Sequence, residues 1–122
     1  MALVHYTAKT VTSGGTSRTI LSADGSSSKT VYVSPLIPTV TSGGEMLVLG
    51  TRINGGENGG EVNIINVSGG QIKTNVCFSV AAGDIIYLDN KECYTVGESL
   101  EIYSDQPDIC VDVFAHSSTV NS

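Results

Sequence analysis

A short phrase that occurs twice places the strongest constraint on the fold of this chain. It reads GDIIYL over residues 83–88 and GESLEI over residues 97–102. Each copy opens with a glycine and an acid, which suit a turn, and continues into alternating large apolar residues, which suit a half-buried strand. A third alternating run follows, with Ile109, Val111 and Val113 on one face. Three strands that share an apolar face must be covered by a second layer.

The rest of the chain repeats this pattern of short apolar runs separated by turn-forming residues. The 14 glycines and the Val/Ile-rich apolar set are typical of strands joined by tight turns, and no window shows a sustained helical period. We therefore predict a single all-β domain, a two-sheet antiparallel β-sandwich of Ig-like or jelly-roll-like type, with about seven to nine short strands and little or no helix. A small closed barrel fits less well, because the proline-bearing segment 34–41 has the pattern of an edge.

The alternation also predicts local details of this sandwich. Further strands are expected over residues 17–23, 29–33, 45–53, 61–67 and 71–80. Gly50 indicates a bulge, and Asn54-Gly55 is typical of a type I′ turn because both residues tolerate positive φ. Strict alternation points Val62 inward and gives Ile72 the same face as Val80.

The two ends of the chain differ from the middle. Residues 3–12 have strand composition but end in a flexible Ser-Gly-Gly joint, so residues 1–16 are expected to be either the first strand of the domain or an arm that reaches a neighbour. Residues 17–116 form the predicted sandwich. Residues 117–122 are polar and are predicted to be a flexible tail.

The charge balance limits the partners of the chain. Six basic residues face twelve acidic ones, which gives a net charge of −6. Nucleic acid and the anionic surface of a membrane would repel such a protein, so neither is an expected partner. The first residues lack the basic and apolar regions of a secretory signal, and we expect the chain to stay in the compartment where it is made.

The three cysteines, Cys77, Cys93 and Cys110, have no metal-binding spacing, and their odd number leaves at least one thiol unpaired. Reduced, buried thiols on strands are the first expectation. A bridge between Cys93 and Cys110 on neighbouring strands is the alternative.

Catalytic chemistry finds little support in the sequence. A set of Cys77, His116 and Asp112 could supply a nucleophile, a base and an orienting acid, but nothing in the spacing selects it. Asp84 and Glu98 could act as paired carboxylates or hold calcium, although their place after glycine favours turn capping. We therefore expect no enzyme, no catalytic residue, no cofactor and no metal ligand.

The C-terminal half resembles small virion proteins of tailed bacteriophages. The resemblance rests on VAAGD at residues 80–84, the turn DNK at residues 89–91, VGESLEIYSD at residues 96–105 and VDV at residues 111–113, with an upstream hairpin over residues 45–67. It implies an accessory structural protein, a capsid decoration (cement) protein that binds across junctions of the major capsid protein and stabilises the head. A neck, tail or fibre component is the alternative.

The same resemblance implies where the protein acts and with what. It would lie on the capsid exterior after assembly in the host cytoplasm, as a homo-oligomer bound to the major capsid protein or to other virion proteins. The resemblance carries over no contact residue. From the arm and from the tip after Arg52, we expect partner contacts at Leu3, Val4, His5, Tyr6, Arg52, Asn54 and Glu57.

A carbohydrate-binding adhesion module for the host surface is a second hypothesis, from a different class. The tyrosines that could stack on sugars are Tyr32, Tyr87, Tyr94 and Tyr103. The absence of Trp weakens this hypothesis, because indole offers the strongest stacking surface.

Overall fold

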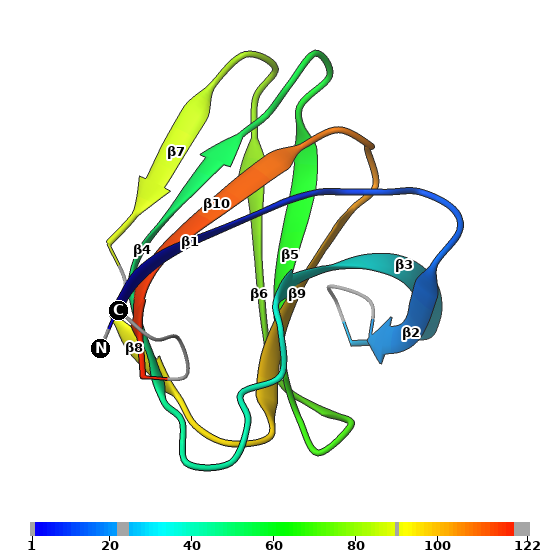
Figure 1. The fold of residues 1–122 in the computed structure, drawn as a ribbon. Helices are drawn as coiled ribbons and strands as arrows, with labels where there is room; N and C mark the ends of the chain where they lie inside the picture. Colours follow the sequence, from blue (N-terminus) through cyan, green and yellow to red (C-terminus); the bar gives the residue numbers. More distant parts are fainter. Residues whose placement is uncertain (1, 22–24, 90, 119–122) are drawn as a thin grey trace.

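The structure is a computed structural model, and it describes residues 2–21, 25–89 and 91–118. Over these residues the chain forms ten β-strands and no helix. The strands make two antiparallel sheets of five strands each (Figure 1). The predicted all-β sandwich is therefore confirmed, and the strand missing from the prediction is the three-residue strand β8 (Glu92–Tyr94).

The first sheet is built around β10. Its strands are β1 (Ala2–Lys9), β4 (Met46–Asn54), β7 (Ile85–Leu88), β8 and β10 (Cys110–Ser117). β10 lies between β1 and β4. The far side of β4 pairs with β7 at one end and with β8 at the other.

The second sheet has the order β2-β3-β9-β5-β6. Its strands are β2 (Thr16–Leu21), β3 (Ser28–Ile37), β5 (Gly60–Ser68), β6 (Gln71–Val80) and β9 (Glu98–Ser104). Four strand pairings are nested inside one another along the chain and alternate between the two sheets. From the outermost to the innermost, they are β1–β10, β3–β9, β4–β7/β8 and β5–β6. This winding is that of a jelly roll, so the topology decides between the two predicted sandwich types.

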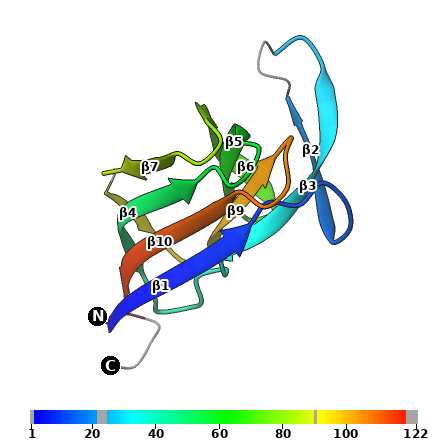
Figure 2. The ribbon, with the colours of Figure 1, turned by 90° about the horizontal axis from the view of Figure 1, so that it is seen from above.

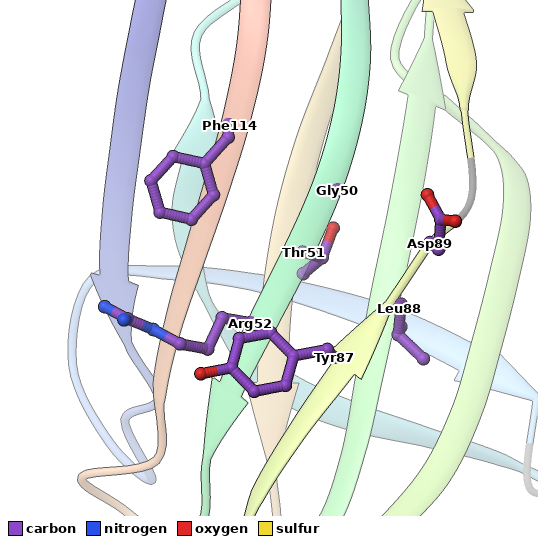
Figure 3. A pocket seen from close by; sticks show the side chains of 7 residues that line it. All are labelled: Gly50, Thr51, Arg52, Tyr87, Leu88, Asp89 and Phe114. Atoms are coloured by element: carbon purple, nitrogen blue, oxygen red, sulfur yellow. The ribbon is translucent and has the colours of Figure 1, made fainter.

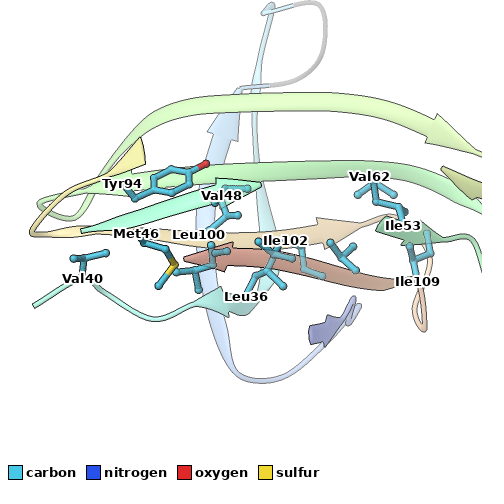
Figure 4. Packing of buried hydrophobic residues seen from close by; sticks show 14 of the residues in the cluster. Leu36, Val40, Met46, Val48, Ile53, Val62, Tyr94, Leu100, Ile102 and Ile109 are labelled. Carbon is cyan, nitrogen blue, oxygen red and sulfur yellow. The ribbon is translucent and has the colours of Figure 1, made fainter. Parts of the chain in front are cut away.

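The main core lies between the two sheets and contains the inward side chains of both (Figure 4). Ile109, Val111 and Val113 are fully buried there, as their alternation predicts. They pack with Ile53 of β4 and Ile102 of β9, which are also fully buried. Burial of each such side chain contributes about 1.5–3 kcal/mol, so this layer holds the two sheets together.

A second, smaller core lies on the outer side of the second sheet. β3 pairs with β9 only through its last residues, whereas its first half pairs with β2. The resulting β2–β3 hairpin extends away from the other strands of the second sheet (Figure 2). It packs on the outward side chains of β5 and β9. This cluster contains Ile20, Val31, Val33, Ile65, Val67 and Tyr103. The outer face of the second sheet is thus covered by the chain itself.

The predicted hairpin over residues 45–67, with a turn at Asn54-Gly55, was wrong, because β4 and β5 lie in different sheets. Among the described residues, Asp108 is the one non-glycine residue with positive φ, and Gly55 is not in the left-handed region either. Instead the loop runs from 55 to 59, and the Asn54 Oδ1 accepts a hydrogen bond of 2.9 Å from the backbone N–H of Gly56. A side chain at Gly55 would meet the backbone of Ala81, so glycine is required there for packing rather than for its φ.

Two irregularities in the ladders decide which way nearby side chains point. The predicted bulge at Gly50 is confirmed, because Phe114 pairs with Gly50 while Ala115 pairs with Val48. The second shift, between β5 and β6, was not predicted and moves Ile72 to the small core under the hairpin, whereas Val80 lies in the main core. The shared face predicted for these two residues is therefore wrong.

Both ends of the chain enter the first sheet. β1 pairs with β10 along its whole length, from Ala2 opposite Ser117 to Lys9 opposite Cys110. The predicted tail starts too early, because Ser117 is buried in β10 and the backbone N–H of Ser118 donates to the carbonyl of Glu45 at 3.0 Å. Residues 119–122 lie outside the described residues.

Candidate functional site

Strand alternation places a set of side chains on the outer surface of the first sheet. We call this surface the open face and define it by Leu3 and His5 of β1, Arg52 of β4, Ile85 and Tyr87 of β7, and Asp112 and Phe114 of β10. The residues between them on the same strands, such as Val4, Ile53, Ile86 and Val113, turn to the main core. Within the described residues, the β2–β3 hairpin packs on the second sheet and leaves the open face uncovered (Figure 2).

The centre of the open face is the carboxylate of Asp112. Its Oδ1 lies 2.8 Å from the Nε2 of His5, and its Oδ2 accepts hydrogen bonds from the Nη2 and Nε of Arg52 at 3.0 and 3.2 Å. Burial raises the pKa of Asp112, but hydrogen bonds from His5, Arg52 and Thr7 outweigh it and hold this pKa below its usual value. Asp112 is therefore a fixed, neutralised anion at the middle of the surface.

The His5 ring also supports an aromatic side chain. It stacks on Phe114 with ring centroids 4.8 Å apart and an angle of 11° between the planes. Because His5 is bonded to Asp112 on one edge and stacked on Phe114 on one face, both rings are held in place.

A shallow groove of about 230 Å³ lies between Phe114 and Tyr87 (Figure 3). Its floor is Gly50, which has no side chain, and Arg52 and Asp89 contribute to its lining. A Cβ built at Gly50 would meet nothing closer than the Leu88 carbonyl oxygen at 3.5 Å. The groove therefore exists because β4 carries glycine at this position.

The structure brings some of the predicted contact residues together and separates others. Leu3, His5 and Arg52 share the open face, while Val4 and Tyr6 pack against the main core. Their inward position follows from the alternation of β1 and separates them from the surface on which Leu3 and His5 stand.

Asn54 and Glu57 are exposed at the end of β4 and in the following loop. They lie beyond the central network of Asp112. Sequence reasoning missed Asp112 and Phe114 as parts of this site. The signal was an acid between two valines, since a carboxylate in the middle of a strand needs a cationic partner nearby.

The tyrosines proposed to stack on sugars are only partly available. Tyr94 and Tyr103 are buried, at 4% and 5% exposure. Tyr94 donates a hydrogen bond to Glu92, and its burial raises its pKa. Tyr32 and Tyr87 are exposed, and Tyr87 borders the groove.

The cysteines do not match the expectation of burial. Cys77 and Cys93 are exposed, Cys110 is half-buried, and all three are free. Cys93 lies opposite Leu47 and Cys110 lies opposite Asn54, so the two thiols are at opposite ends of β4 and cannot form the alternative bridge.

The imagined catalytic set is not assembled. Cys77 is on β6 of the second sheet, whereas His116 and Asp112 are on β10 of the first. The Asp112 carboxylate is instead bonded to His5 and Arg52.

The paired acids are also apart, and Glu98 has a structural role. Its buried carboxylate accepts hydrogen bonds of 3.2 Å from Asn66 Nδ2, Lys73 Nζ and Thr95 Oγ1. Burial raises the pKa of Glu98, but these bonds outweigh it and lower the pKa. Asp84 is exposed, and its N–H closes a turn on Ala81. Among the described residues, the Glu98 carboxylate is thus bound by side chains, and not by the backbone N–H groups that the turn-capping prediction requires.

Among the described residues, no three His, Cys, Asp or Glu side chains are grouped closely enough to hold a metal ion. In the same part of the chain, no helix has the length and apolarity needed to cross a membrane. No family model, curated protein or solved structure matches the chain.

Proposed function

We propose that this chain is an accessory structural protein of a bacteriophage virion, a capsid decoration protein that acts on the capsid exterior across junctions of the major capsid protein. The open face is the observation that supports a role in protein binding. Leu3, Ile85, Tyr87 and Phe114 are exposed on it, at 70%, 50%, 72% and 39%. Large apolar side chains gathered on one surface suit burial against another protein.

The rigidity of this surface favours binding as well. Leu3, Ile85, Tyr87 and Phe114 stand on hydrogen-bonded strands, and the Asp112 network holds His5 and Phe114 in one arrangement. Little conformational freedom would be lost when a partner binds, so less of the contact energy is offset. Many copies on a repeating lattice would gain further strength from their high effective concentration.

The virion assignment itself comes from the sequence resemblance. Its phrases correspond to the turn between β6 and β7, at residues 80–84, and to β9 with its flanks, at residues 96–105. The VDV phrase includes Asp112 and the upstream segment 45–67 includes Arg52, so the resemblance and the open face share these two residues.

The test is a reconstruction of purified phage particles assembled with the wild-type chain or with Tyr87→Asp. The proposal expects density for the wild type on the capsid exterior at subunit junctions, and loss of that density for the variant. Leu21→Asp is the matched control, because Leu21 is 67% exposed but lies on the β2–β3 hairpin. Density at the neck, tail or fibre, or none on the particle, would contradict the decoration role.

Carbohydrate binding is the second candidate function, and Tyr87 is the observation that favours it. The exposed Tyr87 ring borders a groove whose lining also includes Arg52 and Asp89, so a sugar could stack and form hydrogen bonds there. A glycan array with the wild type and Tyr87→Ala tests this. Binding that the variant loses would support it, and the absence of any wild-type signal would reject it.

A further inference from the structure

We propose that the open face binds a second copy of this chain. The proposal rests on the proposed function and deepens it by naming the partner of the same surface. A decoration protein of this kind would thus be built from chains joined through their first sheets.

Charge is the first argument for a second copy as the partner. The fully charged residues on the outward side of β1, β4 and β10 and in the groove are Lys9, Arg52, Asp89 and Asp112. They balance, so the net charge of −6 lies entirely elsewhere on the chain. Two copies that met through another surface would on average bring like charges together, whereas the open face avoids this repulsion.

Shape is the second argument. Tyr87 and Leu3 project from the open face, and the groove over Gly50 forms a hollow in it. In a two-fold contact the same patch faces itself, so it must carry both projections and a hollow that receives them. A groove of about 230 Å³ has room for one large apolar side chain of the other copy. The surface meets this requirement without any third component.

Size is the third argument. Four strands spaced at about 4.8 Å, with roughly eight residues at about 3.4 Å each, give a flat footprint of roughly 500 Å². The side chains that stand on it increase the accessible area, toward the ~800 Å² that each partner of a standard interface buries. The open face is therefore large enough for a stable, if modest, contact between copies.

The experiment measures the oligomeric state of the purified protein over a dilution series, by sedimentation or mass photometry. The wild type is expected to be an oligomer that dissociates on dilution. Gly50→Leu places a side chain in the groove. The fold should stay intact, because a Cβ has room at this position and Gly50 is not in the left-handed region. We expect its self-association to weaken by about tenfold or more.

Leu3→Asp gives a second test with a matched control. Leu3 and Leu21 are almost equally exposed, at 70% and 67%, but Leu21 lies on the hairpin of the other sheet. Leu3→Asp should weaken self-association, and Leu21→Asp should leave it unchanged. Circular dichroism of each variant at low concentration verifies that the monomer is folded.

Three results would overturn the proposal. They are a wild type that is monomeric at every concentration, open-face variants that associate as tightly as the wild type, and a hairpin variant that dissociates equally. A monomeric chain that still occupies the particle would reject self-pairing and leave the decoration role intact. An oligomer that never occupies the particle would reject the decoration role alone.

Discussion

The outer faces of the two sheets differ in how far the rest of the chain covers their apolar side chains. On the second sheet, Ile65, Val67 and Tyr103 point outward but are buried, because the β2–β3 hairpin covers them. On the first sheet, Tyr87 and Phe114 also point outward and remain exposed. One sheet is therefore covered by its own chain, while the other keeps an apolar surface that the part of the chain described by the structure does not cover. The difference indicates that the open face is available for contact.

The two outer faces nevertheless share one feature, an outward carboxylate that is paired with an arginine. On β9 the outward carboxylate of Glu101 accepts a hydrogen bond of 2.8 Å from the Nη2 of Arg18 on the hairpin. On β10 the outward carboxylate of Asp112 is bound by Arg52. In each sheet an acid on an inner strand is neutralised by an arginine, which lowers the cost of covering that surface. The open face therefore carries the same kind of neutralised carboxylate as the covered face.

The largest effect should come from the covered face. Ile65→Ala removes a fully buried side chain beneath the hairpin, and it should lower the free energy of unfolding by about 2–5 kcal/mol through lost packing and a cavity. Urea denaturation measures this. The matched change Leu3→Ala on the open face should alter stability by no more than about 0.5 kcal/mol. Equal effects at the two sites would mean that the faces do not differ in packing.

Two glycines, Gly50 within β4 and Gly55 just after it, sharpen the contrast between packed and open positions. A Cβ at Gly55 would lie 2.2 Å from the Ala81 carbonyl oxygen, so Gly55→Ala should destabilise the fold by about 1–3 kcal/mol. Gly50→Ala on the open face should change stability by about 0.5 kcal/mol or less. Thermal unfolding of both variants compares them. A tolerated Gly55→Ala would show that the loop moves freely.

The pH dependence should reveal how the open face is held. The pKa of Asp112 is lower in the folded protein than its ordinary value of 3.8, so the unfolded chain takes up the proton more readily. The stability from this group is complete above that ordinary value and is lost as the pH falls through it toward the folded pKa.

Asp112→Asn removes this contribution. We expect a loss of about 1–2 kcal/mol at neutral pH and a flatter stability curve below about pH 5. Melting curves of the wild type and the variant from neutral to acidic pH test the prediction. The variant should keep part of the pH dependence of stability, because the pKa of Glu98 is also lowered. A slope identical to that of the wild type would contradict the role given to the Asp112 network.

The smallest effect on the isolated chain should be that of Tyr87→Ala. Tyr87 is mostly exposed, so the change should alter stability by about 0.5 kcal/mol or less at low protein concentration. At high concentration the wild-type melting temperature should rise through self-association, and that of the variant should rise less. Scanning calorimetry over a dilution series measures both. If the melting temperatures of the wild type and the variant rise equally with concentration, Tyr87 does not take part in the contact.

The sequence allowed the strands to be predicted where local chemistry decides the structure. β6 spans residues 71–80, as predicted, because the glycine pair 69–70 precedes it and the turn 81–84 follows it. The inward face of β10 was readable from Val111 and Val113 alone. Ile72 could not be placed, because its orientation depends on a register shift across β5 that leaves no mark in its own segment.

The site was harder to predict than the fold. His5 and Arg52 were named as contact residues, but Asp112, which joins them, is 107 positions away from His5 and becomes its neighbour only when β1 pairs with β10. That pairing follows from the jelly-roll winding, which alternation does not specify. The inward position of Val4 was readable from its own strand, since a two-residue period separates it from Leu3 and His5.

The exposed thiols give the molecule a pair of native labelling points. Cys77 lies on β6 at one edge of the second sheet, and Cys93 lies on β8 at an edge of the first. Dyes attached to them would report from both halves of the sandwich without any substitution. Energy transfer between labelled copies could then follow assembly in real time.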